Sequence, residues 1–198
     1  MKKKCFLSCF SALFLMVFHP VFGHANLKRA YIVTGPESSG SVFITRVISY
    51  VLGKDLFYKQ SSGYGFNGNI GDDLVILHLS QPFCRPAQFC NLAKFHDMFG
   101  DYELYFILTT RDLNIINKSK KERFGGSALE LEEHLDISRE ILGEIIRKEK
   151  YFIWNYETQI YLGAVYFELL YNFLQVKSNF LPGDLYDANE KYLKTSRS

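Results

Sequence analysis

A turn of small and polar residues follows the first apolar run after residue 25 and is suited to binding an anion. It consists of Gly35, Pro36, Glu37, Ser38, Ser39, Gly40 and Ser41. Small side chains leave backbone N–H groups accessible, and a helix starting directly after the turn adds unpaired N–H donors and a positive dipole end. Ser41 and Val42 stand where a nucleoside triphosphatase P-loop has Lys and then Ser or Thr. We therefore expect a phosphate or sulfate site, with an ordinary strand-to-helix turn as the alternative.

Arg111 and Ser119 are a second candidate anion site. Arg111 follows the apolar run LYFILTT, and Ser119 comes eight residues later in a segment with helical character. A guanidinium offers forked donors to phosphate oxygens, and a hydroxyl adds a neutral donor. If a helix starts near Arg111, the two side chains can reach one phosphate. The alternative is a strand-end Arg with a solvated helix Ser.

His78 is the candidate base. It lies near the end of the apolar run LVILHL, and imidazole titrates near neutral pH, so it can accept a proton from an attacking hydroxyl. A structural, hydrogen-bonded histidine is the alternative.

Strands alternating with helices must position these groups. Apolar, β-branched runs predict buried strands over residues 30–34, 74–79, 104–110 and 151–154. Helical patterns cover residues 42–51, 86–99, 113–124, 129–148 and 161–176, and the tail after Pro182 is expected to be irregular. This order predicts an α/β three-layer sandwich with a mostly parallel central sheet, resembling the P-loop NTPase fold. The carboxyl ends of parallel strands meet at one edge, so the turn, His78 and Arg111 should converge there.

The first 25 residues read as a targeting segment. Lys2, Lys3 and Lys4 precede an uncharged run from Cys5 to Phe18, which is shorter than the roughly 20 residues of a spanning helix. Small residues at Gly23 and Ala25 suit signal peptidase, so a cleaved signal peptide is expected, with an uncleaved signal anchor as the alternative. The chain would then enter the secretory route, to a periplasm, the outside of the cell or a Golgi-type lumen, and would touch a membrane only through such an anchor.

The remainder, residues 26–198, is expected to be a single domain. Aromatic residues make up 16% of the chain, which argues for a packed core over disorder. Without the three lysines of the first segment, 20 Lys and Arg face 21 Asp and Glu, a net charge of −1, so no nucleic-acid partner is expected.

The cysteines leave two interpretations open. Cys84 and Cys90 could close a short disulfide loop in an oxidising compartment, or both could be free thiols. Cys and His residues show no zinc-ligand spacing, so no metal is expected.

Taken in order, the turn GPESSGS, the strand LVILHLSQP and the segment LTTRDLNIINKS resemble the sulfotransferase family. The segments FIWNYE and DANEKY also resemble later parts of bacterial-type members. The resemblance implies a 3′-phosphoadenosine 5′-phosphosulfate (PAPS) donor, with its sulfuryl end at Ser38 to Ser41 and its 3′-phosphate on Arg111 and Ser119. It implies that His78 deprotonates a hydroxyl acceptor, either a carbohydrate or a small molecule, and that adenosine 3′,5′-bisphosphate is the product.

The sequence departs from that pattern in its cations. Many family members carry a Lys in the turn, whereas here the turn has none and includes Glu37, for which we expect a structural role. Arg46 is the nearest cation but falls on a different helix face from the turn. Arg85, in the loop after His78, is a candidate to contact the turn. The sequon Asn117-Lys118-Ser119 overlaps the 3′-phosphate site, so we expect it to be unused. The alternatives are a secreted non-catalytic protein that binds a nucleotide or a partner and, less favoured, a P-loop kinase.

Overall fold

The structure is a computed structural model that describes residues 28–54, 66–67, 72–83, 87–125, 127–183 and 187–193. Its strands are β1 (Lys28–Pro36), β2 (Phe66–Asn67), β3 (Leu74–Gln81), β4 (Tyr102–Thr110) and β5 (Lys150–Asn155). Its helices are α1 (Ser41–Val51), α2 (Leu92–Met98), α3 (Leu113–Phe124), α4 (Ala128–Lys148), α5 (Tyr156–Leu162), α6 (Ala164–Phe173) and α7 (Glu190–Leu193).

The described strands form one sheet in the order β2-β3-β1-β4-β5. The neighbours from β3 to β5 pair in parallel, and β2 pairs antiparallel with β3 at one edge. β1 lies in the middle, with Val33 opposite both His78 of β3 and Ile107 of β4. The expected mostly parallel sheet is therefore confirmed, and the carboxyl ends of β1, β3 and β4 lie side by side.

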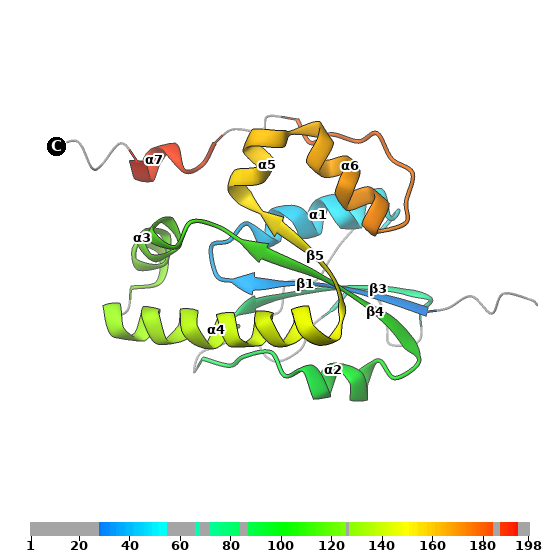
Figure 1. The fold of residues 1–198 in the computed structure, drawn as a ribbon, viewed down its shortest axis with the longest axis horizontal. Helices are drawn as coiled ribbons and strands as arrows, with labels where there is room; N and C mark the ends of the chain where they lie inside the picture. The colour runs from blue at the N-terminus through cyan, green and yellow to red at the C-terminus, as the bar shows by residue number, and fades with distance from the viewer. Residues whose placement is uncertain are drawn as a thin grey trace, which may run out of the picture.

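Helices cover both faces of the sheet, which confirms the three-layer α/β sandwich. Figure 1 shows α1, α5 and α6 on one face and α2 and α4 on the other. Successive residues of β1 alternate between the two cores: Ala30 and Ile32 pack on the α2 and α4 side, and Tyr31 and Val33 on the α1 and α6 side. Both faces of the strand are apolar because both are buried.

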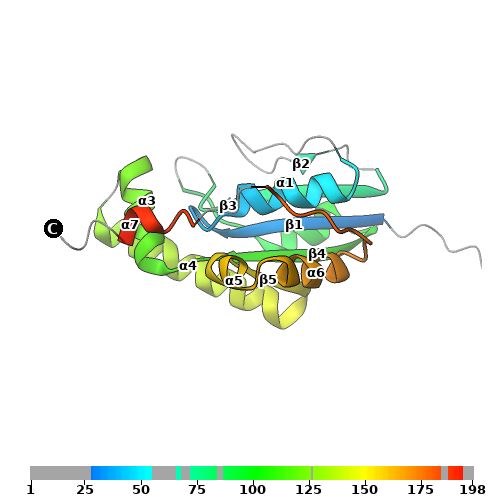
Figure 2. The same ribbon diagram turned by 90° about the horizontal axis from the view of Figure 1, so that it is seen from above.

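In the carboxyl-terminal part of the chain, two regions differ from the sequence-based expectation. The helix expected over residues 161–176 is divided into α5 and α6 at Gly163, whose φ of 52° lies in the left-handed region that glycine tolerates. α5 also begins earlier, because the Asn155 side chain accepts a hydrogen bond from the backbone N–H of Thr158 at 2.8 Å. The tail, expected to be irregular, contains α7, which both Figure 1 and Figure 2 show beside α3.

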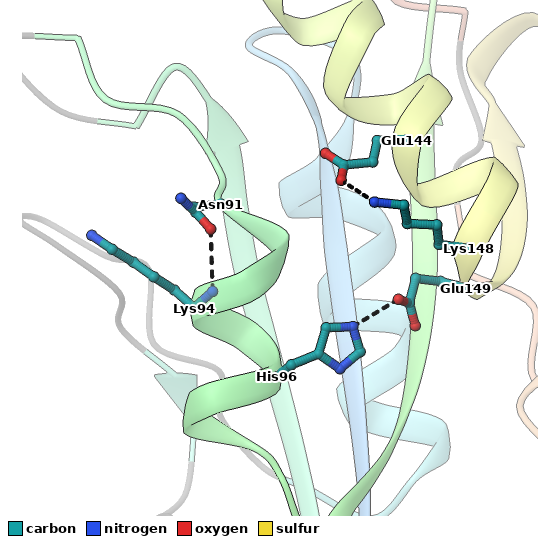
Figure 3. A network of polar contacts seen from close by, with 6 residues as sticks. All are labelled: Asn91, Lys94, His96, Glu144, Lys148 and Glu149. Carbon is teal, nitrogen blue, oxygen red and sulfur yellow. Dashed lines mark hydrogen bonds and ion pairs between the residues drawn. The ribbon is translucent and has the colours of Figure 1, made fainter.

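At the amino end of β5, a polar contact ties α2 to the residue that follows α4. Figure 3 shows His96 pointing from α2 toward Glu149, with 2.8 Å between Nε2 and Oε1. Asn91 caps α2 by accepting from the backbone N–H of Lys94 at 3.2 Å, so the helix expected over 86–99 starts only at Leu92. These contacts lie away from the carboxyl ends of the strands.

Several predictions fall outside the described residues, including the targeting segment, Cys84 and Arg85. Cys90 is a free thiol, and burial raises its pKa to about 12. Within the part of the chain that is described, none of the helices combines the length and apolar character needed to cross a bilayer.

Candidate functional site

The turn between β1 and α1 is fixed by a close approach of two strands. A Cβ atom on Gly35 would lie 2.2 Å from the backbone oxygen of Thr109 in β4, so only glycine fits there. Beyond it, Ser38 has a φ of 69° and Gly40 a φ of 90°, both in the left-handed region. Gly40 is the N-cap of α1 and provides no side-chain cap, so the first N–H groups of α1 remain available to a ligand.

A cavity of about 430 Å³ opens beside this turn at the carboxyl ends of the strands. Its lining comprises Glu37, Ser38, Gly40, Ser41, Val42, His78, Leu79, Ser80, Pro82, Phe83, Arg111, Ser119, Arg123 and Phe124. The turn, the strand-end histidine and the Arg–Ser pair, which the sequence places up to 84 residues apart, therefore share one cavity. Gly35, Pro36 and Ser39 do not line it, and Ser39 is fully buried with its Oγ 2.6 Å from Thr109 Oγ1.

His78 is almost completely buried and is bonded to the turn. Its Nε2 lies 2.9 Å from Ser41 Oγ, and only 2% of the residue is exposed. If Nε2 is the unprotonated nitrogen, the Ser41 hydroxyl donates to it. A hydroxyl in the cavity would then reach His78 by displacing Ser41 or by passing its proton through Ser41. This arrangement can serve a base, and it equally resembles a satisfied structural histidine.

Arg111 and Ser119 converge on Ser38. Arg111 follows β4, and its Nη1 donates to the backbone oxygen of Ser38 at 3.0 Å. Asp112 caps α3 by accepting from Ile115 N–H at 3.0 Å, which starts the helix so that Ser119 faces the turn. Ser119 Oγ donates to Ser38 Oγ at 3.1 Å. The sequence-based pairing of this Arg and Ser thus has a geometric counterpart.

Lys120 supplies a cation that the sequence alone did not reveal. It is 2% exposed, and its Nζ lies 3.6 Å from Glu37 Oε2. Desolvation lowers the pKa of Lys120, and Glu37 partly offsets the shift. Glu37 is therefore the partner of a buried lysine, which compensates the charge of this cavity-lining carboxylate. Eighty-three residues separate the two, and no local pattern indicates their contact.

Arg123 is a second cation that the sequence reading missed. It lines the cavity, and its Nη1 donates to Ser38 Oγ at 3.4 Å. A sequence signal for it exists, because Arg123 follows Ser119 by four residues and so shares its face of α3. Arg46, in contrast, is exposed on α1 and does not line the cavity. The positive charge missing from the turn is thus provided by α3.

The cavity combines hydroxyl donors, a helix N-terminus and the guanidinium groups of Arg111 and Arg123, which suits a ligand carrying phosphate or sulfate. Among the described residues, no cluster of three or more His, Cys, Asp or Glu side chains could hold a metal ion. Within α3, Ser119 is 3% exposed and Asn117, the acceptor of the sequon, is half-buried. Comparison of the chain with protein-family models, with curated proteins and with solved structures finds no match.

Proposed function

We propose that this chain is a sulfotransferase that moves a sulfuryl group from PAPS to a hydroxyl acceptor, a carbohydrate or a small molecule. One observation carries the proposal: the turn, His78 and the Arg111–Ser119 pair, each singled out separately in the sequence, line one cavity. Arg111 and Ser119 also contact the same turn residue, Ser38. This shared contact supports the proposal, because two unrelated polar residues would have no reason to meet there.

In this proposal the 5′-phosphosulfate lies against Ser38, Gly40, Ser41 and the N-terminus of α1. Arg111 and Ser119 bind the 3′-phosphate, and Arg123 approaches from the same face of α3 as Ser119. The acceptor oxygen forms a bond to sulfur while the bond from sulfur to the 5′-phosphate oxygen breaks. The acceptor proton passes to His78, directly or through Ser41, and adenosine 3′,5′-bisphosphate leaves. The protein contributes mainly position and charge stabilisation, as in phosphoryl transfer.

A second candidate is a secreted, non-catalytic protein that binds a nucleotide or a partner through the same fold. The contact between His78 Nε2 and Ser41 Oγ favours it, because the base is occupied and nearly inaccessible. If that protein binds the nucleotide, both candidates use the same site and only turnover separates them.

Calorimetric titration of the protein with adenosine 3′,5′-bisphosphate and with ATP tests the site. We expect the bisphosphate to bind and ATP to bind more weakly, since the turn lacks the P-loop Lys. Arg111→Met should weaken bisphosphate binding at least about tenfold. Arg139→Met is the matched control, because Arg139 is an exposed arginine of α4 that does not line the cavity. Failure of the bisphosphate to bind would reject the sulfotransferase and the nucleotide-binding form of the second candidate, and tighter binding of ATP would favour a kinase.

Transfer of labelled sulfate from PAPS to 4-nitrophenol and to a chitin oligosaccharide then separates the two candidates. The sulfotransferase proposal expects transfer to one of them and its loss in His78→Asn, with bisphosphate affinity changed less than about threefold. Bisphosphate binding with no transfer to either acceptor would favour the non-catalytic protein.

A further inference from the structure

The position of Arg111 is set by a segment near the end of the chain. Its Nε donates to Asn189 Oδ1 at 2.7 Å, and its Nη1 donates to the Ser38 carbonyl at 3.0 Å. Its Nη2 is buried and has no hydrogen-bond partner among the described residues. The guanidinium of Arg111 is therefore held from two sides, by the turn and by Asn189. Arg111 lines the cavity, and its Nη2 lacks an acceptor among the described residues.

Asn189 is itself fixed. It is 5% exposed, and its Nδ2 donates to Glu157 Oε1 at 2.9 Å. The same carboxylate oxygen accepts the backbone N–H of Asp112 at 3.1 Å, at the start of α3. With its oxygen toward a donor and its nitrogen toward an acceptor, the amide of Asn189 has one satisfactory orientation. Glu157 thus fixes Asn189, and Asn189 fixes Arg111.

Aromatic and backbone contacts hold the rest of the segment 187–193 against the same arginine. The guanidinium carbon of Arg111 lies 4.5 Å from the centre of the Tyr156 ring and 5.8 Å from that of Tyr192. Tyr156 in turn accepts the backbone N–H of Ala188 at 2.8 Å, and Lys118 donates to the Tyr192 carbonyl at 3.1 Å. The segment is therefore bound to α3 and α5 through the surroundings of Arg111, and Figure 2 shows α7 lying beside α3.

We propose that residues 187–193 are a positioning segment for the ligand site, in which Asn189 orients Arg111 toward the anion. The inference rests on the proposed function in one respect, that the anion is the 3′-phosphate of the nucleotide. An anion against Arg111 supplies the acceptor that Nη2 lacks, and that gain depends on Asn189 holding the guanidinium in place. By linkage, ligand binding strengthens the docking of the segment as much as docking strengthens binding.

The test compares adenosine 3′,5′-bisphosphate with adenosine 5′-monophosphate, which lacks the 3′-phosphate. We expect Asn189→Ala to weaken binding of the bisphosphate roughly tenfold and binding of the monophosphate less than about twofold, because only the bisphosphate contacts Arg111. Asn172→Ala, at an exposed position of α6, should change neither affinity. A general disturbance of the fold would weaken binding of both ligands equally. The ratio of the bisphosphate affinity to the monophosphate affinity therefore reports on the positioning of Arg111.

A second pair of variants separates the amide geometry from simple packing. Asn189→Asp keeps an acceptor for Arg111 but places a carboxylate against Glu157, so selectivity for the bisphosphate should fall. Adding Glu157→Gln restores a donor–acceptor pair between positions 157 and 189. The double variant should therefore recover part of the selectivity for the bisphosphate over the monophosphate. In addition, bisphosphate should slow amide hydrogen exchange over residues 187–193 in the wild type, and Arg111→Met should abolish that protection.

The outcomes are distinguishable. If the wild type binds the bisphosphate and Asn189→Ala leaves the ratio of the two affinities unchanged, the positioning role is wrong and the proposed function stands. The same holds if exchange over residues 187–193 is unaffected by ligand. If the wild type does not bind the bisphosphate, the proposed function is wrong and this inference fails with it.

Discussion

The turn and the side of the cavity opposite it hold their groups by different means. Residues 35–41 are anchored by short, neutral contacts to neighbouring strands, such as Ser39 Oγ to Thr109 Oγ1 at 2.6 Å and Glu37 N–H to the Gln81 carbonyl at 3.2 Å. The opposite side, here called the α3 side, consists of Arg111, α3 and residues 187–193. It is held largely by charged side chains, including buried Lys120, whose ammonium has a 3.6 Å ion pair and no hydrogen-bond partner among the described residues.

Because of this difference, we expect the turn to contribute mainly to the stability of the fold and the α3 side mainly to ligand affinity. Neutral contacts between backbone-anchored groups do not depend on a ligand, so a variant in the turn should change the free energy of unfolding. Charges with incomplete partners are unfavourable in the free protein and become favourable when an anion arrives. A variant on the α3 side should therefore change affinity at little or no loss of stability. The following predictions test that division.

Gly35→Ala should have the largest effect. The added Cβ would lie 2.2 Å from the backbone oxygen and 2.3 Å from Oγ1 of Thr109, so β1 and β4 would have to separate. We expect the free energy of unfolding to fall by more than about 3 kcal/mol in urea denaturation. Gly183→Ala is the control, since nothing lies within 4 Å of its Cβ position, and it should change stability by less than about 0.5 kcal/mol. Equal stability of the two variants would contradict the close approach.

Ser39→Ala should lower stability without affecting the ligand. Ser39 is fully buried and outside the cavity lining, and the substitution removes its bond to Thr109. Thr109 Oγ1 retains the Thr34 carbonyl at 3.3 Å, so we expect a loss of only about 1–2 kcal/mol. Bisphosphate affinity measured by calorimetry should stay within about twofold. A large loss of affinity at unchanged stability would place Ser39 in the site after all.

The division also explains what the sequence could predict. Apolar runs over residues 30–34, 74–79 and 104–110 indicated parallel strands, and because such strands end at one edge, the residues that follow them had to converge. The location of the turn can therefore be predicted from the sequence, because the turn and the strand and helix that flank it are consecutive in the chain.

The α3 side depends on contacts between distant residues. Lys120 meets Glu37, and Asn189 meets Arg111 from 78 residues away, with no periodicity to indicate either pair. Arg123 is the exception, because helical spacing places it above Ser119. The division of the expected helix at Gly163 had a weaker signal, since a glycine inside a helical pattern can also be tolerated.

Lys120→Met should raise stability slightly while it weakens binding. A buried ammonium with an imperfect partner is unfavourable, whereas Glu37, with a quarter of its side chain exposed, can still be hydrated. We expect the variant to be equal to the wild type or up to about 1 kcal/mol more stable. Bisphosphate affinity should fall several-fold, because Glu37 then repels the anion. Lys121→Met is the control at the exposed neighbouring residue of α3, and it should change neither stability nor bisphosphate affinity.

The pH dependence gives a second check on Lys120. Burial lowers its pKa below the ordinary 10.5, so the unfolded chain holds this proton more tightly than the folded protein. As pH rises through the window between the folded pKa and 10.5, this group therefore makes the wild type progressively more stable. The advantage of Lys120→Met should shrink over that window. An advantage that grows with pH would mean that the ammonium is stabilised by folding.

Arg123→Met should have the smallest effect and the strongest dependence on salt. Arg123 is exposed at the rim, with one 3.4 Å hydrogen bond to Ser38 Oγ and its guanidinium carbon 4.8 Å from the centre of the Phe124 ring. An exposed charge is screened, so we expect bisphosphate affinity to fall about threefold in low salt and the difference to vanish near 1 M salt. Arg139→Met carries the same loss of charge on α4 and should leave affinity unchanged at every salt concentration. If the two variants behave alike, Arg123 does not serve the ligand, and the cation on the α3 side that compensates the turn is Lys120 alone.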